Sequence, residues 1–406
     1  MGHVSKTPAG NFRANWRDPA GDQKAKTFKT RKEANAYLAE IEQSLNRGTY
    51  IDPKAGKLLF STHAQRWLDA RHVETRTQER TESVMRVHLL PKWGQWPLAK
   101  IEHLSVQEWV NELSRRLAPA SVAKCHTTLS MVLGSAVRAR LIPFNSCEGV
   151  KLPSTHKPKR PALALSKTEF FDKLLPTVPV EHRALVALPA GSGLRWGECV
   201  GLTWSNIDLN RDILRVVQVV IETGGSRSIK PFPKSKAGVR TIPIPRFLAD
   251  ELQALRSAKG EVDSTSLVFA TRTGLPPLRS TFRREVWRPA LVQAGLLGAV
   301  VDLAPDKWRA TWPDEDGMTW DKEFTTERDA VAHVAVNAAG GIRFHDLRHS
   351  YATWLVSDGV PVNIVQKVMG HENASTTLNL YTHAPNEFEK RIKDVFDDSA
   401  DDPLTE

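Results

Sequence analysis

The sequence of 406 residues predicts a multidomain α+β protein: a small sheet with one helix, an all-helical bundle, and a larger, mainly helical region with a β-hairpin. Three patterns predict this order. Residues 11–38 alternate apolar and polar side chains before turning helical. Apolar residues from about 58 to 150 recur at three- and four-residue spacings, as on amphipathic helices. The stretch 153–161, rich in proline and basic residues, then forbids a continuous helix.

The N-terminal pattern, within residues 1–55, is that of a three-stranded sheet with one helix. Phe12, Ala14 and Trp16 alternate with polar residues, and a turn and a second strand-like run follow. A helix is expected from Thr30 to about Asn46. Cations crowd the polar face expected for this module, and a single basic face suits contact with DNA phosphates. We expect such contacts from Arg13, Arg17, Lys24, Lys26 and Lys29.

The helical region, residues 56–150, contains two helix starts at which basic residues gather. They lie at Thr75 and Pro119 and bring Arg76, Arg80 and Lys124 to places where they can contact phosphates. A linker at 151–162 follows, and its cations suit a strap along the duplex backbone. The linker cations are Lys157, Lys159 and Arg160.

The sequence also contains an internal repeat. Shifting Phe12 to Leu38 by 296 positions aligns it without gaps on Trp308 to Val334, with ten identities in 27 positions. We therefore predict a second sheet-plus-helix module at about 303–340. The first copy holds seven basic and three acidic residues, and the second holds three basic and seven acidic residues, so their net charges are +4 and −4.

These opposite charges predict different roles for the two copies. DNA repels the acidic second copy. We expect the first copy to bind DNA and the second to contact protein, such as the basic face of a neighbouring subunit. The alternative is that the insert only decorates the surface.

The second half of the chain holds four fragments that supply the groups for breaking and rejoining a phosphodiester. They are Gly-Leu-Arg-Trp-Gly-Glu at 193–198, Lys236, His-Asp-Leu-Arg at 345–348, and Met-Gly-His at 369–371 followed by Tyr381. A phosphodiester under attack gathers negative charge, which the guanidinium groups of Arg195 and Arg348 can hold. His345 lies three residues before Arg348 and so shares one face of a helix with it.

A proton donor and a nucleophile complete this chemistry. Lys236 lies in a predicted hairpin turn before a short strand, where a mobile ammonium can protonate the departing deoxyribose oxygen. Lys234 remains an alternative for this role. Tyr381 is the candidate nucleophile. A phenol has a reference pKa of about 10, so it needs nearby cations and a partner such as His345 or His371 to lose its proton.

In type and order these residues resemble the tyrosine recombinase family, specifically the phage-type integrases, from about residue 10 to about residue 395. The resemblance implies a catalytic set of two arginines, a lysine, two histidines and a tyrosine, buttressed by a glutamate. These are Arg195, Lys236, His345, Arg348, His371, Tyr381 and, in support, Glu198. The chain departs from the family pattern at Ser192, where threonine is frequent, and at Met369, where leucine is frequent. Neither departure touches the chemistry.

The resemblance also implies a domain order. An AP2-like arm-binding module at 1–55 precedes a SAM-like core-binding domain at 56–150. The catalytic domain covers 163–396 and contains the inserted repeat, and an acidic tail covers 397–406. We expect Ser375 to cap a short, movable helix that carries Tyr381.

The function that the resemblance implies is site-specific DNA recombination through a covalent 3′-phosphotyrosine. Four protomers would join two duplexes and exchange strands through a Holliday junction. The expected outcome is integration of a phage or mobile element, and excision with accessory factors. The partners implied are double-stranded attachment-site DNA, a DNA-bending host factor and an excision factor. No metal or other cofactor is expected.

Composition agrees with a nucleic-acid partner. The formal net charge is +10 and the pI is about 9.5, which suits a polyanion. The sequence has no apolar run of 18 residues and no secretion signal, so we expect a cytoplasmic protein that works at the bacterial nucleoid. Cys125, Cys147 and Cys199 are expected to be reduced and buried.

Three rival functions share part of this pattern. His345 and His349 imitate the two-histidine helix of zinc peptidases, but Arg348 would place a cation beside the metal. A type IB topoisomerase uses a related set of residues, and two DNA-binding modules before residue 150 favour site-specific exchange instead. A catalytically idle DNA-binding regulator would have lost some of these groups, and none is missing.

Overall fold

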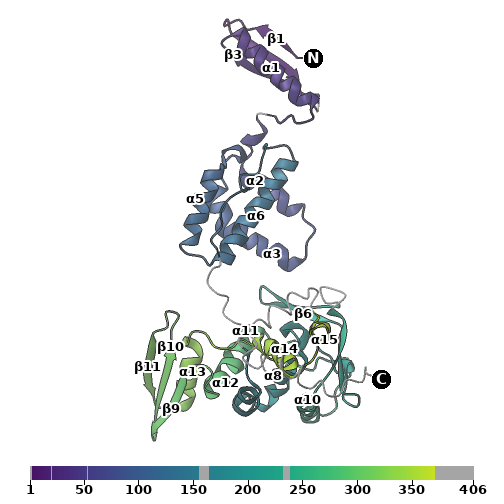
Figure 1. The fold of residues 1–406 in the computed structure, drawn as a ribbon, viewed down its shortest axis with the longest axis vertical. Coiled ribbons are helices and arrows are strands. Elements are labelled where there is room, and N and C mark those ends of the chain that lie inside the picture. Colours follow the sequence, from purple (N-terminus) through teal and green to yellow (C-terminus); the bar gives the residue numbers. More distant parts are fainter. Residues whose placement is uncertain (1, 20, 53, 155–163, 232–237, 371–406) are drawn as a thin grey trace, which may run out of the picture. The chain divides into compact units, whose positions relative to one another are not determined.

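The computed structural model describes residues 2–19, 21–52, 54–154, 164–231 and 238–370. The chain forms two compact units, residues 1–159 and 160–406. Each unit is a body of its own, and the protein is multidomain, built of helices and small sheets (Figure 1).

The first unit begins with a small antiparallel sheet in the order β1-β2-β3, formed by β1 (His3–Lys6), β2 (Phe12–Arg17) and β3 (Gln23–Phe28). Helix α1 (Arg31–Asn46) packs on one face of this sheet. The helix starts where the sequence predicts, because the Thr30 hydroxyl accepts from the Glu33 N–H at 3.2 Å and the Glu33 carboxylate accepts from the Thr30 N–H. Ala14 and Trp16 lie buried under the helix.

The rest of the first unit is helical. Its helices are α2 (Phe60–Asp69), α3 (Thr75–Val84), α4 (Leu90–Trp93), α5 (His103–Ser114) and α6 (Pro119–Arg138). The predicted helix starts at Thr75 and Pro119 are confirmed. Trp93 and Trp109 meet edge to face in the core, with ring centroids 5.8 Å apart. Cys125 and Cys147 are unpaired and buried here, as expected.

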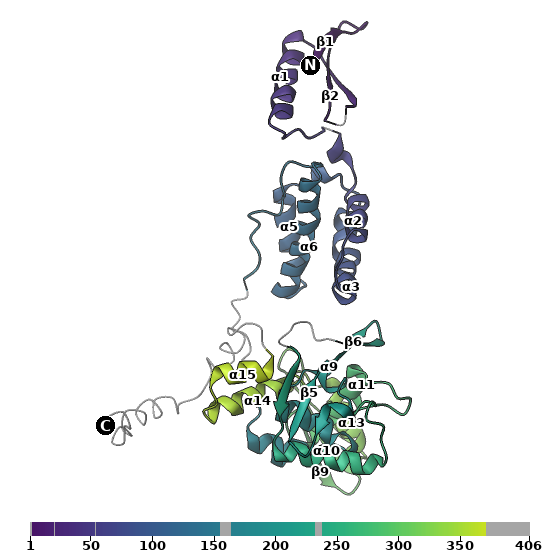
Figure 2. The ribbon, with the colours of Figure 1, turned by 90° about the vertical axis from the view of Figure 1, so that its right-hand side faces the viewer.

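Helix α8 (Val180–Ser192) forms the centre of the second unit, and every residue from Ala184 to Ser192 is buried. Helices α10 (Arg246–Lys259) and α14 (Asp346–Ser357) pack against it. Helix α15 (Val362–Met369) lies beside α14 in both views (Figures 1 and 2). Shorter helices in this unit are α7 (Leu175–Thr177), α9 (Trp196–Cys199), α11 (Arg279–Phe282) and α12 (Arg288–Gln293).

Two small sheets border this helical core. One has the order β4-β5-β8, with β4 (Ile207–Asp208), β5 (Ile213–Val216) and β8 (Arg240–Pro243). The other is the hairpin of β6 (Val219–Thr223) and β7 (Ser226–Lys230). Strand β8 is the short strand expected after Lys236. The β6–β7 hairpin was not among the elements expected from the sequence.

Three helices widen into a π-helical turn just before a proline. The turns cover Met85–Leu89, Glu169–Leu174 and Arg283–Trp287, and they precede Pro91, Pro176 and Pro289. A proline ring clashes with the carbonyl group four residues earlier and offers no N–H to it. In each case that carbonyl lies inside the widened turn, so the helix continues past the proline without a tight clash.

The inserted module repeats the N-terminal module strand for strand. Its elements are β9 (Ala299–Ala304), β10 (Lys307–Pro313), β11 (Thr319–Phe324) and α13 (Glu327–Asn337), and its sheet order is β9-β10-β11. The pairs His3 with Asn15 and Phe12 with Phe28 in the first copy become Ala299 with Thr311 and Trp308 with Phe324 in the second, each shifted by 296. The predicted repeat is therefore a repeat of structure.

The insert begins earlier than residue 303, the start expected from the sequence. Strand β9 begins at Ala299. The prediction started too late because the aligned repeat began at Phe12, which left out β1 and therefore also its counterpart β9. Helix α13 packs on α12, and the sheet lies on the outer side of α13 (Figure 1). The buried guanidinium of Arg288 donates to the carbonyl oxygens of Ala335 and Ala338, which fixes the end of α13 to α12.

Candidate functional site

The site is built around the end of α8, where the chain must reverse within one residue. Gly193 ends the helix with φ of 67°, a left-handed conformation that favours glycine. A Cβ at this position would lie 2.7 Å from Met369 Sδ and 2.7 Å from Tyr351 Cδ1. The end of α8 therefore packs tightly against α14 and α15 at Gly193. The chain turns there, and Arg195 lies two residues later, at the start of α9.

Arg195 and Glu198 form a local pair across the first turn of α9. The Glu198 carboxylate accepts from the Arg195 backbone N–H at 2.9 Å and from Arg195 Nη1 at 3.1 Å. The Arg195 side chain is 42% exposed, whereas that of Glu198 is 4% exposed. A buried carboxylate thus holds an arginine that still reaches the surface.

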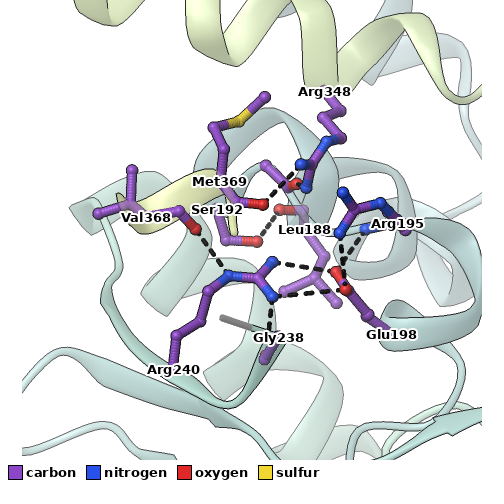
Figure 3. A network of polar contacts seen from close by, with 10 residues as sticks. Leu188, Ser192, Arg195, Glu198, Gly238, Arg240, Arg348, Val368 and Met369 are labelled. Atoms are coloured by element: carbon purple, nitrogen blue, oxygen red, sulfur yellow. Dashed lines mark hydrogen bonds and ion pairs between the residues drawn. The ribbon is translucent and has the colours of Figure 1, made fainter. Parts of the chain in front are cut away.

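Arg240, the first residue of β8, binds the same carboxylate from the other side (Figure 3). Its Nη2 lies 3.0 Å from Glu198 Oε2, and its Nη1 lies 3.4 Å from Oε1. Its Nε donates to the carbonyl oxygen of Val368 at 2.7 Å, and Nη1 also donates to that of Gly238 at 3.0 Å. Arg240 was not among the site residues expected from the sequence, although it lies only four positions after Lys236.

The charges around Glu198 determine its ionisation. Burial on its own would raise the pKa of Glu198, but Arg240 and then Arg195 outweigh burial and lower this pKa below its ordinary value. The carboxylate is therefore ionised at neutral pH.

Arg348, in the first turn of α14, is a buried cation bound to backbone oxygens. Its Nη2 donates to the carbonyl oxygen of Met369 at 2.6 Å, and its Nη1 donates to that of Gly193. Burial, followed by repulsion from Arg195, lowers the pKa of Arg348 to about 9. Arg348 therefore remains a cation at neutral pH, close to the other expected arginine.

His345 lies just before α14 and carries little tendency to take up a proton. Desolvation of its ring, followed by the nearby His349, Arg348 and Arg195, lowers the pKa of His345 to about 4. The imidazole is neutral at neutral pH, although the residue is exposed to water, and it is the neighbouring cations that oppose a further charge here. A neutral imidazole can accept a proton from a hydroxyl group.

Helix α14 is held at both ends, which fixes the positions of His345 and Arg348. The backbone of Leu165 donates its N–H to Ser350 Oγ at 2.9 Å and accepts from Trp354 Nε1 at 2.8 Å. Before the helix, Arg343 Nη2 lies 2.8 Å from the buried carboxylate of Asp346. The helix therefore presents both candidate residues from a rigid support.

Several expected site residues lie outside the part of the chain that the structure describes. They are Lys234, Lys236, His371, Ser375 and Tyr381, together with the linker cations Lys157, Lys159 and Arg160. The described residues bring together Arg195, Glu198, His345 and Arg348.

In the N-terminal module the five expected DNA contacts do not share one face. Strand alternation places Arg13 and Arg17 on the face away from α1, and both are exposed. Lys24 and Lys26 pair with Trp16 and Ala14 and so lie on the other face. This corrects the expectation of a single basic face.

Lys24 and Lys26 are also engaged within the module. Lys24 Nζ lies 3.0 Å from Asp52 Oδ2 and 3.3 Å from Asp18 Oδ2, and Lys26 Nζ lies 4.4 Å from the ring centroid of Tyr37. Lys26 is nevertheless exposed, and so are four other candidates: Lys29, Arg76, Arg80 and Lys124.

The described residues also bear on metal binding and on membrane insertion. No group of three or more histidine, cysteine, aspartate or glutamate side chains within the described ranges is arranged to hold a metal ion. His345 and His349 meet edge to face, with ring centroids 5.2 Å apart. No helix in the described part of the chain has the length and apolarity needed to cross a membrane.

Comparison with known families places this site in context. The sequence profile of the Phage integrase family matches residues 168–313 and 324–387, which is more than half of the chain. The chain belongs to the phage integrase family. The profile of the phage integrase N-terminal SAM-like domain also matches this family member, at residues 59–114. The gap between the two longer matches falls in the β10–β11 turn and β11 of the insert.

Curated relatives of this phage integrase family member include recombinases and prophage integrases. A XerC-like tyrosine recombinase of Caldanaerobacter subterraneus is 27% identical over 296 residues, which cover 70% of this chain and 67% of that protein. The prophage phiRv2 integrase of Mycobacterium tuberculosis is 24% identical over 401 residues, which cover 97% of this chain and 94% of that protein.

Solved structures share the fold of this family member. The Tn1549 transposon integrase in complex with transposon right end DNA matches 84% of this chain and all of that chain, with a TM-score of 0.61 and 19% identity. A lambda integrase tetramer bound to a Holliday junction matches 92% of this chain and 96% of that chain, with a TM-score of 0.52 and 16% identity.

Proposed function

We propose that this phage integrase family member is a site-specific DNA recombinase that integrates a phage or other mobile element through a covalent 3′-phosphotyrosine. The observation that carries the proposal is the meeting of Arg195 and Arg348 at one place. They come from segments 153 positions apart in the sequence, and Glu198 and His345 lie beside them. Two guanidinium groups held together by the fold suit a phosphodiester whose charge grows during attack.

Each residue of the set has a distinct task in the proposed reaction. The phenol oxygen of Tyr381 bonds to the scissile phosphorus after its proton leaves, and neutral His345 can accept that proton. The bond from phosphorus to the 5′ oxygen breaks, and Lys236 protonates that oxygen. Arg195 and Arg348 hold the charge on the phosphate oxygens. The 5′ hydroxyl of another strand then reverses these steps, with His371 assisting.

The proposed assembly is a homotetramer on two DNA duplexes. The printed description of a structural neighbour, a lambda integrase tetramer on a Holliday junction, supports this form. We further infer that a DNA-bending host factor and an excision factor set the direction of exchange. The reaction itself needs no metal or nucleotide in this scheme, and it takes place where the bacterial chromosome lies, in the cytoplasm.

The two repeated modules divide the work of binding. We infer that the N-terminal copy is an AP2-like arm-binding module that contacts DNA, with Arg13 and Arg17 on its open sheet face. The inserted copy carries Asp321 on the corresponding exposed face, beside Glu323, which is paired with Lys307 and Arg309. Acidic groups there disfavour DNA and favour a basic protein surface, and a second copy of this chain offers one because of its net charge of +10.

Capture of the covalent intermediate tests the proposed function. Purified protein is mixed with random and host-derived duplexes in EDTA and denatured in detergent, and the DNA that remains attached is sequenced, with Tyr381→Phe in parallel. Attached DNA in the wild type alone is the expected result, because the substitution removes the hydroxyl group that forms the ester. Equal binding of DNA by both proteins without any adduct from the wild type would overturn the proposal.

A further inference from the structure

One buried carboxylate in the site serves two arginines that come from different parts of the fold. Glu198 accepts from Arg195 on its own turn of helix and from Arg240 on β8, which lies 42 positions away in sequence. The side chains of Glu198 and Arg240 are 4% and 6% exposed, whereas that of Arg195 is 42% exposed. Arg240 is thus the buried partner of the pair, and Arg195 is the partner that reaches outward.

The two arginines use the carboxylate unequally. Arg240 contacts both oxygens, Nη2 to Oε2 at 3.0 Å and Nη1 to Oε1 at 3.4 Å. Among the residues that the structure describes, the side chain of Arg195 gives Glu198 a hydrogen bond from Nη1 only. Its Nε and Nη2 therefore remain for another acceptor, and a guanidinium binds phosphate best through two such donors.

We propose that Arg240 is a positioning residue for DNA cleavage: by holding both oxygens of Glu198, it keeps part of the Arg195 guanidinium available to the scissile phosphate. This inference rests on the proposed role of Arg195 in phosphate binding. Arg240 itself is buried and makes no contact with DNA in this scheme. Its contacts with Gly238 and Val368 hold it in place for this task.

Removal of Arg240 has a clear physical consequence for its neighbours. A buried carboxylate that loses one of two cations draws the remaining cation closer, because an unpaired buried charge is costly. Arg195 would then turn both outer nitrogens toward Glu198 and away from the phosphate. The groups that act on Glu198 would be reduced to Arg195, Arg348 and the Cys199 thiol, so its carboxylate would take up a proton at a higher pH than in the wild type.

The test compares Arg240→Gln and Arg240→Lys with the wild type. Arg246→Gln is the matched control, because Arg246 is an exposed arginine paired with Asp250 in the same unit. Single-turnover cleavage is measured on a duplex that carries the captured cleavage site, once with a normal scissile phosphate and once with a neutral methylphosphonate. The neutral substrate needs less help from Arg195, since it lacks one negative oxygen.

We expect Arg240→Gln to slow cleavage of the normal phosphate by roughly 10- to 100-fold, as for groups that act through another residue, and Arg240→Lys to slow it less. The loss should shrink on the methylphosphonate, and the acidic limb of the pH profile should move to higher pH. If Arg240 were merely structural, Arg240→Gln would slow the cleavage of both substrates equally and would leave the pH profile unchanged. That result would overturn the inference.

Two further outcomes remain distinguishable. If Arg240→Gln does not fold, Arg240→Lys decides the question, because it keeps a cation beside Glu198 but cannot hold both oxygens in a fork. Wild-type rates in Arg240→Lys on both substrates would then refute the inference. If the wild type forms no adduct with either duplex, the proposed function fails rather than the role of Arg240.

Discussion

Arg348 Nη2 lies 2.6 Å from the carbonyl oxygen of Met369, so the first turn of α14 holds the last residue of α15. The same guanidinium donates to Gly193 at the end of α8. One side chain thus joins three segments that are distant in sequence. One of them ends at Met369, two positions before His371. In this structure Arg348 supports the site as well as supplying its charge.

We predict that Arg348→Lys lowers both cleavage and stability. An ammonium cannot span the carbonyl groups of Gly193 and Met369 as a planar fork does. Cleavage should fall roughly 100- to 1,000-fold, the usual effect of losing one donor to a developing anion. The free energy of unfolding of the second unit should fall by about 2 kcal/mol, from lost charged hydrogen bonds. Single-turnover rates and denaturant titration measure the two effects. Arg211→Lys, at an exposed arginine, should change neither, and a fully active Arg348→Lys would contradict the assigned role.

We predict that Gly193→Ala is far more harmful than Gly359→Ala. Both glycines have positive φ, but a Cβ at Gly193 would meet Met369 and Tyr351, whereas a Cβ at Gly359 would meet nothing within 4 Å. The expected losses in unfolding free energy are roughly 3 kcal/mol at Gly193 and about 1 kcal/mol at Gly359. Thermal unfolding of the two variants measures the difference. Equal losses would mean that Met369 and Tyr351 pack more loosely around Gly193 than these distances imply.

We predict that His345 stays neutral at pH values well below those at which a histidine side chain ordinarily takes up a proton. The folded pKa of about 4 lies below the reference value of 6.5, so the unfolded chain binds the proton more readily between these two pH values. The contribution of His345 to stability is therefore complete above pH 6.5 and is lost as the pH falls toward 4. Titration of labelled histidine side chains by NMR, with His345→Gln to assign the resonance, measures this pKa. A midpoint near 6.5 would contradict the packing around the ring.

We predict opposite effects of charge changes in the two repeated modules. Arg17→Gln should lower the salt dependence of DNA binding by about one unit of logarithmic slope, because one phosphate contact is lost. Asp321→Asn should leave this slope unchanged. Binding of a random duplex at several salt concentrations measures both. A reduced slope in Asp321→Asn would show that the insert, too, touches DNA.

The insert should instead affect contacts between protein chains. Asp321→Lys reverses a charge on its exposed sheet face and should weaken self-association on DNA, because it removes attraction to a basic surface. Sedimentation of the protein bound to duplex measures this effect. Glu181→Lys, at an exposed acid outside the insert, is the control. Identical association of all three proteins would leave the insert as a surface decoration.

The sequence predicted the features that depend on neighbours along the chain. The start of α1 follows from Thr30 and Glu33, which cap it within one turn. The repeated module was visible because both copies kept the same order of apolar and turn residues. Arg195, His345 and Arg348 stood out because phosphate chemistry needs cations and a base, and because their order along the chain resembles that of the tyrosine recombinase family.

Features that depend on the folded packing were not visible in the same way. Arg240 acts on residues 42 and 128 positions away, and no local pattern marks such contacts. Lys24 and Lys26 lie on the sheet face opposite to that of Arg13 and Arg17. The two-residue period of a strand could have predicted this, because the two lysines pair with Trp16 and Ala14 of β2. The π-helical turns depend on how each helix accommodates its proline, which the sequence alone leaves open.

The inserted module starts and ends at almost the same point. A Cβ on Gly341 would lie 2.9 Å from Leu297 Cδ1, so the chain leaves the helical core and returns to it side by side. Joining such close ends costs little loop entropy, whether the segment between them is long or short. The module can therefore be inserted, removed or exchanged as one continuous segment of the gene, and the surrounding domain keeps its fold.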